Sequence, residues 1–173
     1  MKTTSTLQMT LRTMLLSLSL VITTPAAFAH SDAPDVKHKA DAPISAEEFS
    51  FGKQGDPKNV TRTITIDMND RMRFIPGDIK VRQGETIRFV VRNQGKLLHE
   101  MVIGTMAELK SHQEMMRQHP GMEHDEAYMT HVGPGKKGEM VWQFSKAGEF
   151  YYACLIPGHF EAGMVGKITV TKG

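Results

Sequence analysis

Short stretches in which apolar and polar residues alternate make up most of the chain after Asn59. In residues 86–93, Ile87, Phe89 and Val91 occupy every second position, which is the period of a strand with one face turned toward a core. Similar runs rich in β-formers occupy residues 61–68, 79–82, 101–103, 139–144, 148–154 and 166–171. Short strands separated by frequent turns predict an all-β sandwich or barrel. A parallel α/β sheet would need helices that alternate with strands, and the sequence does not show that pattern.

Residues 105–137 interrupt this pattern with a helical one. Thr105 followed by Glu108 forms a capping box, which is the signature of a helix N-terminus. Apolar residues then recur at helical spacing until the His-Pro-Gly sequence at 119–121, namely Met106, Leu109 and Met116. We predict one amphipathic helix followed by a polar loop, inserted into the β-domain.

The first 29 residues have the composition of a secretory signal peptide. They contain Lys2 and Arg12 but no acidic residue, and an apolar run precedes the sequence Ala-Phe-Ala, a pattern typical of a cleavage site. About ten apolar residues are too few for a membrane span, which needs roughly twenty. The following residues are rich in Asp, Ala, Pro and Lys, which is typical of a disordered segment. The predicted organisation is a signal peptide over 1–29, a flexible N-terminal arm over 30–58, and one domain over 59–173 with the insertion 105–137.

The charge balance changes when the leader is removed. The 173-residue chain has 21 basic and 19 acidic residues, but two of the basic ones lie in the leader, so cleavage after Ala29 leaves 19 of each in 144 residues. No net basic field then favours nucleic acid or an anionic membrane surface, and no later segment is apolar enough to span a bilayer. We therefore expect one exported domain in the periplasm, with no nucleic-acid partner and no membrane span in the mature chain.

Cys154 is the single cysteine, so no internal disulfide can form. A free thiol in an oxidising compartment is vulnerable unless it is buried or bound to something. Four residues separate Cys154 from His159, and four more separate His159 from Met164. A loop of this length can bring the three side chains together, and thiolate, imidazole and thioether suit a copper ion that alternates between Cu(I) and Cu(II). His99, which follows the strand ending at Asn93, is the candidate for a second imidazole.

These residues resemble the cupredoxins, the family of plastocyanin, azurin, rusticyanin and auracyanin. The resemblance covers residues 59–173 and includes FIPGDIKV at 74–81, GETIRF at 84–89, Asn93 shortly before His99, and the final Cys-His-Met loop. The spacing within that loop is more similar to rusticyanin and auracyanin than to plastocyanin.

The resemblance implies an all-β fold, a cupredoxin-like Greek-key β-sandwich, that binds one type 1 copper ion. His99, Cys154 and His159 would be the equatorial ligands, and Met164 the weak axial ligand. By the same resemblance, Asn93 would form hydrogen bonds near the ligand loops. Electrons would pass through the edge of the His159 ring to a redox partner protein, or copper would pass to or from a donor or acceptor protein.

Other readings of the same residues remain open. Cys154 could be an ordinary buried cysteine in a β-sandwich. A zinc site is possible in principle, but zinc favours several thiolates or histidines without a thioether. A cysteine hydrolase would need a histidine base and an oxyanion pocket, and nothing in the sequence supplies that pocket. An oxidase would need paired His-x-His motifs, which the chain lacks, so we expect no enzymatic activity.

The insertion and the segment after it are dense in methionine and histidine. They could form a second, softer copper site, because thioethers select Cu(I); alternatively the methionines pack the core and the histidines are solvated. A further hypothesis is that His30, if exposed as a new N-terminus, could chelate Cu(II) together with His38. The residues of the segment are Met106, His112, Met115, Met116, His119, Met122, His124, Met129 and His131.

The sequence thus predicts a copper protein with one of two roles, single-electron transfer or periplasmic copper handling and tolerance. The alternative is a copper storage protein or chaperone, or a cuprous oxidase, that uses weaker additional copper sites in the methionine- and histidine-rich segment.

Overall fold

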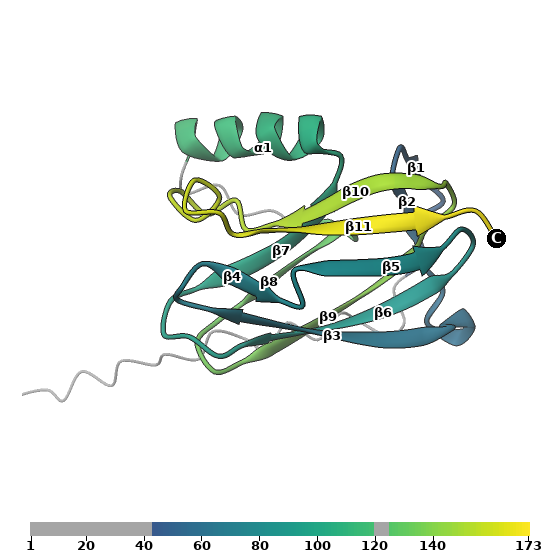
Figure 1. The fold of residues 1–173 in the computed structure, drawn as a ribbon, viewed down its shortest axis with the longest axis horizontal. Helices are drawn as coiled ribbons and strands as arrows, with labels where there is room; N and C mark the ends of the chain where they lie inside the picture. The colour runs from purple at the N-terminus through teal and green to yellow at the C-terminus, as the bar shows by residue number, and fades with distance from the viewer. Residues whose placement is uncertain (1–42, 120–124) are drawn as a thin grey trace, which may run out of the picture. The chain divides into compact units, whose positions relative to one another are not determined.

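The computed structural model describes residues 43–119 and 125–173, which form two β-sheets and one α-helix (Figure 1). The first sheet has the strand order β1-β2-β9-β6-β3-β4, with β1 Glu48–Phe49, β2 Gly52–Gln54, β9 Lys137–Gln143, β6 Thr86–Asn93, β3 Arg62–Asn69 and β4 Arg73–Ile75. The second sheet has the order β5-β11-β10-β7-β8, with β5 Asp78–Arg82, β11 Val165–Thr171, β10 Gly148–Ala153, β7 His99–Gly104 and β8 Met129–Val132. Strands β3 and β6 are parallel, as are β5 and β11, and the other pairs are antiparallel.

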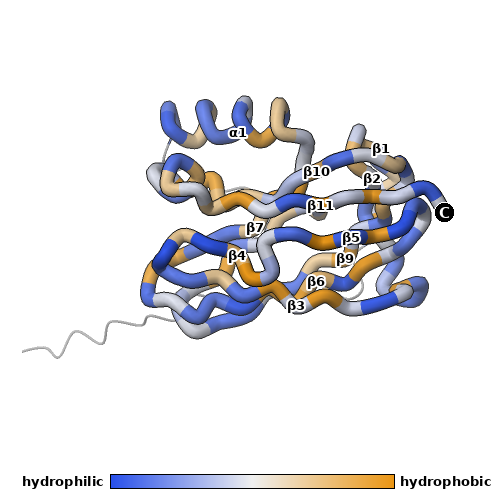
Figure 2. The backbone as a smooth tube through the Cα atoms, in the orientation of Figure 1, coloured by the Kyte–Doolittle hydropathy of each residue, from blue (hydrophilic) through white to orange (hydrophobic). Residues whose placement is uncertain are grey.

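The core consists of the apolar faces of both sheets, which appear as alternating colours along the strands in Figure 2. Strand β6 contributes Ile87, Phe89 and Val91, all fully buried, as its period of two predicts. Burial of one such side chain contributes about 1.5–3 kcal/mol to stability. The sequence-based prediction of a β-sandwich with a single helix is therefore confirmed.

The prediction of a flexible arm over residues 30–58 is wrong for its last part. Residues 48–54 form β1 and β2, and β2 pairs with β9 through Lys53 and Gln54. Phe51 is buried and stacks on Trp142 with ring centroids 5.2 Å apart, and the Trp142 indole N–H donates to the Phe51 carbonyl at 3.0 Å. Aromatic burial thus outweighs the polar composition that suggested disorder. The predicted signal peptide and residues 30–42 lie outside the described residues.

The insertion contains more regular structure than the predicted helix and loop. Helix α1 spans Met106–Gln118 and begins with the predicted capping box between Thr105 and Glu108. Leu109 and Met116 are buried on the side of the helix that faces β7 and β10. The predicted polar loop is wrong after residue 128, because β8 pairs there with β7 and three of its four residues, Met129, Thr130 and Val132, are buried. Within the described residues, no helix is long and apolar enough to cross a membrane.

Strand pairing brings three chain segments to one end of the second sheet. Ala153, at the end of β10, pairs with Val102 of β7 and with Val165 at the start of β11. The loop between β10 and β11 therefore lies beside the beginning of β7, and Figure 1 shows this loop under helix α1. The start of β7 is His99, and the loop begins with Cys154.

Candidate metal centre

His99, Cys154 and His159 converge at this end of the sandwich. One side-chain nitrogen or sulfur atom from each lies within 4.8 Å of the others. Among the histidine, cysteine and acidic side chains of the described residues, these three are the group that could hold a metal ion. The Cys154 Sγ atom is 3.2 Å from His159 Nδ1, and the two imidazole rings have centroids 4.9 Å apart. His99 and His159 are thus neighbours in space, although they are 60 positions apart in the sequence.

 Other residues that meet at the centre are also distant in the sequence. Asp70 and His99 are 29 positions apart, and Glu100 and Leu155 are 55 positions apart. The folding of the two sheets, and not closeness in the chain, therefore assembles the centre.

The loop that carries Cys154, His159 and Met164 is closed by its own backbone hydrogen bonds. The Cys154 N–H donates to the Met164 carbonyl at 3.1 Å, and the Met164 N–H donates to the His159 carbonyl at 3.0 Å. Gly158 and Gly163 have φ angles of +88° and +90°, a region that favours glycine, and these two residues allow the tight turns of the loop. Met164 is fully buried, and its backbone contacts place it next to the other two predicted ligands.

His99 has one imidazole nitrogen that is paired and one that is not. Its Nε2 atom lies 3.1 Å from Asp70 Oδ1, whereas its buried Nδ1 atom has no hydrogen-bond partner among the described residues. Backbone hydrogen bonding from Lys96 lowers the pKa of Asp70, with a further contribution from His99, so Asp70 is a carboxylate and can only accept. A proton on Nε2, shared with this carboxylate, would leave the Nδ1 lone pair available to a metal ion, which fits the donor set of a copper site.

The protonation of the other two groups follows from their burial. Burial raises the pKa of Cys154 to about 12, so without a metal the group is a neutral thiol. Burial, followed by the nearby His99 ring, lowers the pKa of the half-buried His159, which keeps this imidazole neutral. A bound cation would favour the thiolate, because a coordinating thiol loses its proton.

Glu100 connects the ligand loop to strand β8, a role that the sequence did not predict. Its carboxylate is buried, and Oε1 accepts from the N–H of Leu155, the residue after Cys154, at 2.8 Å. Its other oxygen, Oε2, lies 2.8 Å from Nε2 of His131 on β8. The only available signal was an acidic residue directly after His99 in a strand of otherwise apolar residues.

Asn93 forms the hydrogen bonds near the ligand loops that the resemblance implied. Its side-chain amide donates to the carbonyls of Leu97 and Val132 at 2.7 and 2.8 Å, and its Oδ1 atom accepts from the Gly95 N–H at 2.8 Å. The buried Asn93 side chain therefore joins the loop before His99 to strand β8.

The methionine- and histidine-rich segment divides into different environments. Met116 and Met129 are buried and serve packing, Met115 is 41% exposed, and His131 contacts Glu100. Met122 and His124 lie outside the described residues. The packing interpretation therefore holds for Met116 and Met129, and the interpretation as a second copper site stays a prediction.

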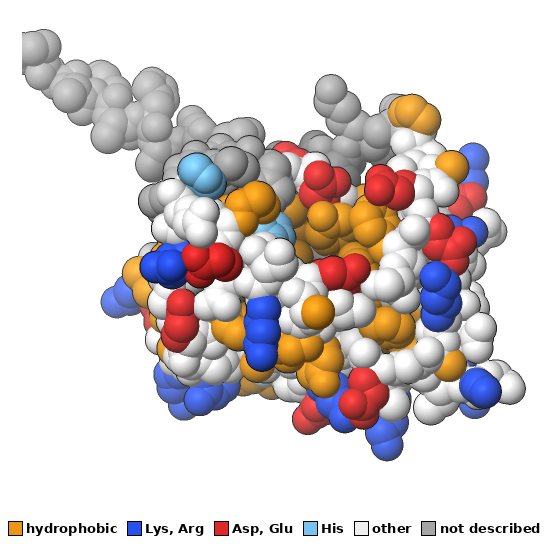
Figure 3. Space-filling model, turned by 90° about the horizontal axis from the view of Figure 1, so that it is seen from above, with side chains coloured by type: hydrophobic (Ala, Val, Ile, Leu, Met, Phe, Trp, Pro, Cys, Tyr) orange, Lys and Arg blue, Asp and Glu red, His pale blue; other side chains and the backbone are white. Residues whose placement is uncertain are grey.

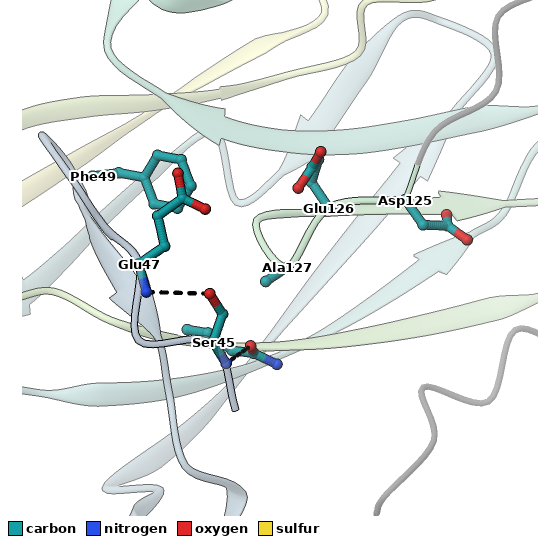
Figure 4. A pocket seen from close by; sticks show the side chains of 7 residues that line it. Ser45, Glu47, Phe49, Asp125, Glu126 and Ala127 are labelled. Atoms are coloured by element: carbon teal, nitrogen blue, oxygen red, sulfur yellow. Dashed lines mark hydrogen bonds between the residues drawn. The ribbon is translucent and has the colours of Figure 1, made fainter. Parts of the chain in front are cut away.

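An open pocket of about 290 Å³ lies apart from the three candidate ligands. Its walls come from residues 45–54, which include β1 and β2, and from the chain before β8. Figure 4 shows Glu47 on one side with Asp125 and Glu126 on the other. Figure 3 shows a hollow in the surface, with apolar side chains at its floor and acidic side chains around it. Its lining includes no histidine or cysteine, so the pocket is not part of the candidate metal centre.

The family model of copper-binding proteins of the plastocyanin/azurin family matches residues 60–171. This chain belongs to that family. As a cupredoxin it has relatives named copper-resistant cuproprotein CopI: one from Rubrivivax gelatinosus is 51% identical over 133 residues, covering 77% of this chain and 76% of the relative. Another from Vibrio cholerae is 34% identical over 163 residues, covering 89% and 96%.

Solved structures support the fold of this cupredoxin. Auracyanin B has a TM-score of 0.59 at 19% identity, covering 72% of this chain and 96% of auracyanin B. Dithionite-reduced auracyanin from the photosynthetic bacterium Roseiflexus castenholzii has a TM-score of 0.56 at 22% identity, covering 65% and 98%. At these identities the similarity concerns the fold alone.

Proposed function

We propose that this cupredoxin is an exported type 1 copper protein that binds one copper ion through His99, Cys154, His159 and Met164. The observation that carries the proposal is the buried, unpartnered Nδ1 atom of His99, which lies in a group with a buried thiol and a second imidazole. Such an atom is costly to bury unless it gains a partner, and a metal ion supplies one. The thioether of Met164 would complete a donor set that copper prefers to zinc.

Bound copper would supply a one-electron exchange between Cu(II) and Cu(I). The protein's contribution is to hold the ligands in a fixed arrangement, through the hydrogen bonds that close the ligand loop and through Glu100 and Asn93 behind it. A rigid set of ligands needs little rearrangement when the oxidation state changes. His159 is the half-buried member of the set, so its ring edge is the proposed contact for a redox partner or a copper donor or acceptor protein.

We favour copper handling and tolerance in the periplasm as the biological role. Three relatives that carry the name copper-resistant cuproprotein support this, at 51%, 38% and 34% identity. The composition of residues 1–29, which is that of a signal peptide, supports export. No enzymatic activity is included in the proposal.

A second candidate function is copper storage or delivery, or cuprous oxidase activity, through additional sites in the methionine- and histidine-rich segment. The observation that favours it is the exposed thioether of Met115 on helix α1, because core packing does not account for it. This candidate requires more than one copper ion per chain. Copper titration therefore separates it from the leading proposal.

The test is an optical spectrum of the purified protein with one equivalent of Cu(II), compared with Cys154→Ser. The wild type should show intense visible absorption from thiolate-to-copper charge transfer, and the variant should show none. Met115→Leu is the matched control, because it removes an exposed thioether outside the proposed ligand set and should leave the spectrum unchanged. Absence of this absorption in a folded, copper-treated wild type would refute the proposal.

The biological role needs a separate test in cells. A strain that lacks the protein should grow poorly in copper and recover with the wild-type chain but not with Cys154→Ser. Growth that recovers fully with this variant would show that tolerance does not depend on the proposed centre.

A further inference from the structure

Asp70 lies in the turn between β3 and β4 and reaches across to the first predicted ligand. Its Oδ1 atom is 3.1 Å from His99 Nε2 and 3.2 Å from the Leu97 N–H, and its Oδ2 atom accepts from the Lys96 N–H at 2.8 Å. One carboxylate therefore binds both the imidazole of His99 and the backbone of the loop that leads to it. Its side chain is 35% exposed, so it lies at the border between the centre and solvent.

Gly95 makes this close approach possible. A β-carbon added at Gly95 would collide with Asp70 Oδ1 and lie 2.7 Å from Asp70 Cγ, so only glycine leaves room for the carboxylate. The contacts of the Asp70 carboxylate with this loop thus depend on Gly95, which lies 25 residues further along the chain.

We propose that Asp70 is a positioning residue of the copper centre, which fixes the Nε2–H tautomer of His99 and favours Cu(II) over Cu(I). The inference rests on the proposed function, since it concerns the same ligand. A carboxylate that accepts from the outer nitrogen of a ligating histidine orients the ring and raises the basicity of the ligating nitrogen. Its negative charge also stabilises a nearby divalent ion more than a monovalent one, because the Coulomb energy is proportional to the charge.

The consequence is a difference between the two oxidation states. Removal of such an outer partner lowers metal affinity by about 10- to 100-fold. We expect Asp70→Asn to lower the affinity for Cu(II) more than the affinity for Cu(I). A tenfold difference between the two losses raises the reduction potential by about 59 mV for a one-electron couple.

The experiment compares Asp70→Asn with Asp67→Asn in the full chain. Asp67 is a matched control, because it lies in β3 three residues before Asp70 and its substitution removes the same charge. Its carboxylate is bound by Arg92 at 2.6 and 2.8 Å and does not contact His99. Cu(II) and Cu(I) affinities and the reduction potential are measured for the wild type and both variants. The potential should rise in Asp70→Asn and change much less in Asp67→Asn.

An unchanged potential in a folded Asp70→Asn protein, or an equal rise in both variants, would overturn the inference while leaving the proposed copper site intact. The copper-free protein gives a second measurement that needs no variant. The ¹⁵N shifts of the His99 ring should show a protonated Nε2 and an unprotonated Nδ1, and the opposite tautomer would contradict the role given to Asp70. Failure of the wild type to bind copper at all is a different result, and it would refute the proposed function itself.

Discussion

The pair of Glu100 and His131 gives a quantitative test of how the candidate centre is supported. Truncation of His131 to alanine would leave the buried Glu100 Oε2 atom without the imidazole that now lies 2.8 Å away. The Oε1 atom would keep its 2.8 Å hydrogen bond from Leu155. The carboxylate would therefore lose about half of its contacts while it remains inside the protein.

The magnitude follows from the burial of the two groups. Removing one partner of a fully buried charged pair costs about 3–5 kcal/mol, and a hydrogen bond to a charged group contributes about 1.5–3 kcal/mol. The His131 side chain is 26% exposed, so water can reach the space that the truncation opens. We therefore expect the lower value, a loss of about 2 kcal/mol in the free energy of unfolding, or a fall of roughly 4–8 °C in melting temperature.

The assay is urea unfolding of the copper-free protein, with His119→Ala as the control. His119 is an exposed histidine at the end of helix α1, and its truncation should change stability by less than about 0.5 kcal/mol. Adding Glu100→Gln to His131→Ala should recover part of the loss, because a neutral amide is less costly to bury than an unpaired carboxylate. A loss below about 0.5 kcal/mol, or strictly additive effects in the double variant, would refute the reasoning.

Two further predictions concern other parts of the fold. Gly166→Ala would drive a methyl group into the ring of the fully buried Tyr152 and should cost about 1–3 kcal/mol or more, whereas Gly77→Ala, whose nearest neighbour would be 3.8 Å away, should be nearly neutral in the same thermal melts. Thr105→Ala removes the N-cap of helix α1 and should cost about 1 kcal/mol. Burial raises the pKa of Glu108, but hydrogen bonds from Thr105 outweigh it and leave the pKa lowered. The stabilisation from Glu108 is therefore present above about pH 4 and lost as the pH falls through its folded pKa, and an NMR titration of Thr105→Ala should show a higher Glu108 pKa.

The strands and the ligand loop could be predicted because their signals are local. Strand β6 follows its period of two, and Cys154, His159 and Met164 are spaced within one loop. Phe51 was assigned to a flexible arm because its burial depends on Trp142, which is 91 residues away. The roles of Asp70 and Glu100 could not be predicted for the same reason, because their partners His99 and Leu155 are 29 and 55 residues away. No local pattern distinguishes such carboxylates from surface ones.

The pairing of β2 with β9 determines how far the chain can be shortened. A fragment that starts at Val60, where the match to the family begins, would lack the phenyl ring that covers Trp142 and the carbonyl that its indole N–H meets. It would also leave the end of β9 as an unpaired strand edge beside a newly exposed aromatic surface, a combination that promotes self-association. Residues 48–54 are therefore part of the folding unit, and a soluble fragment must retain them.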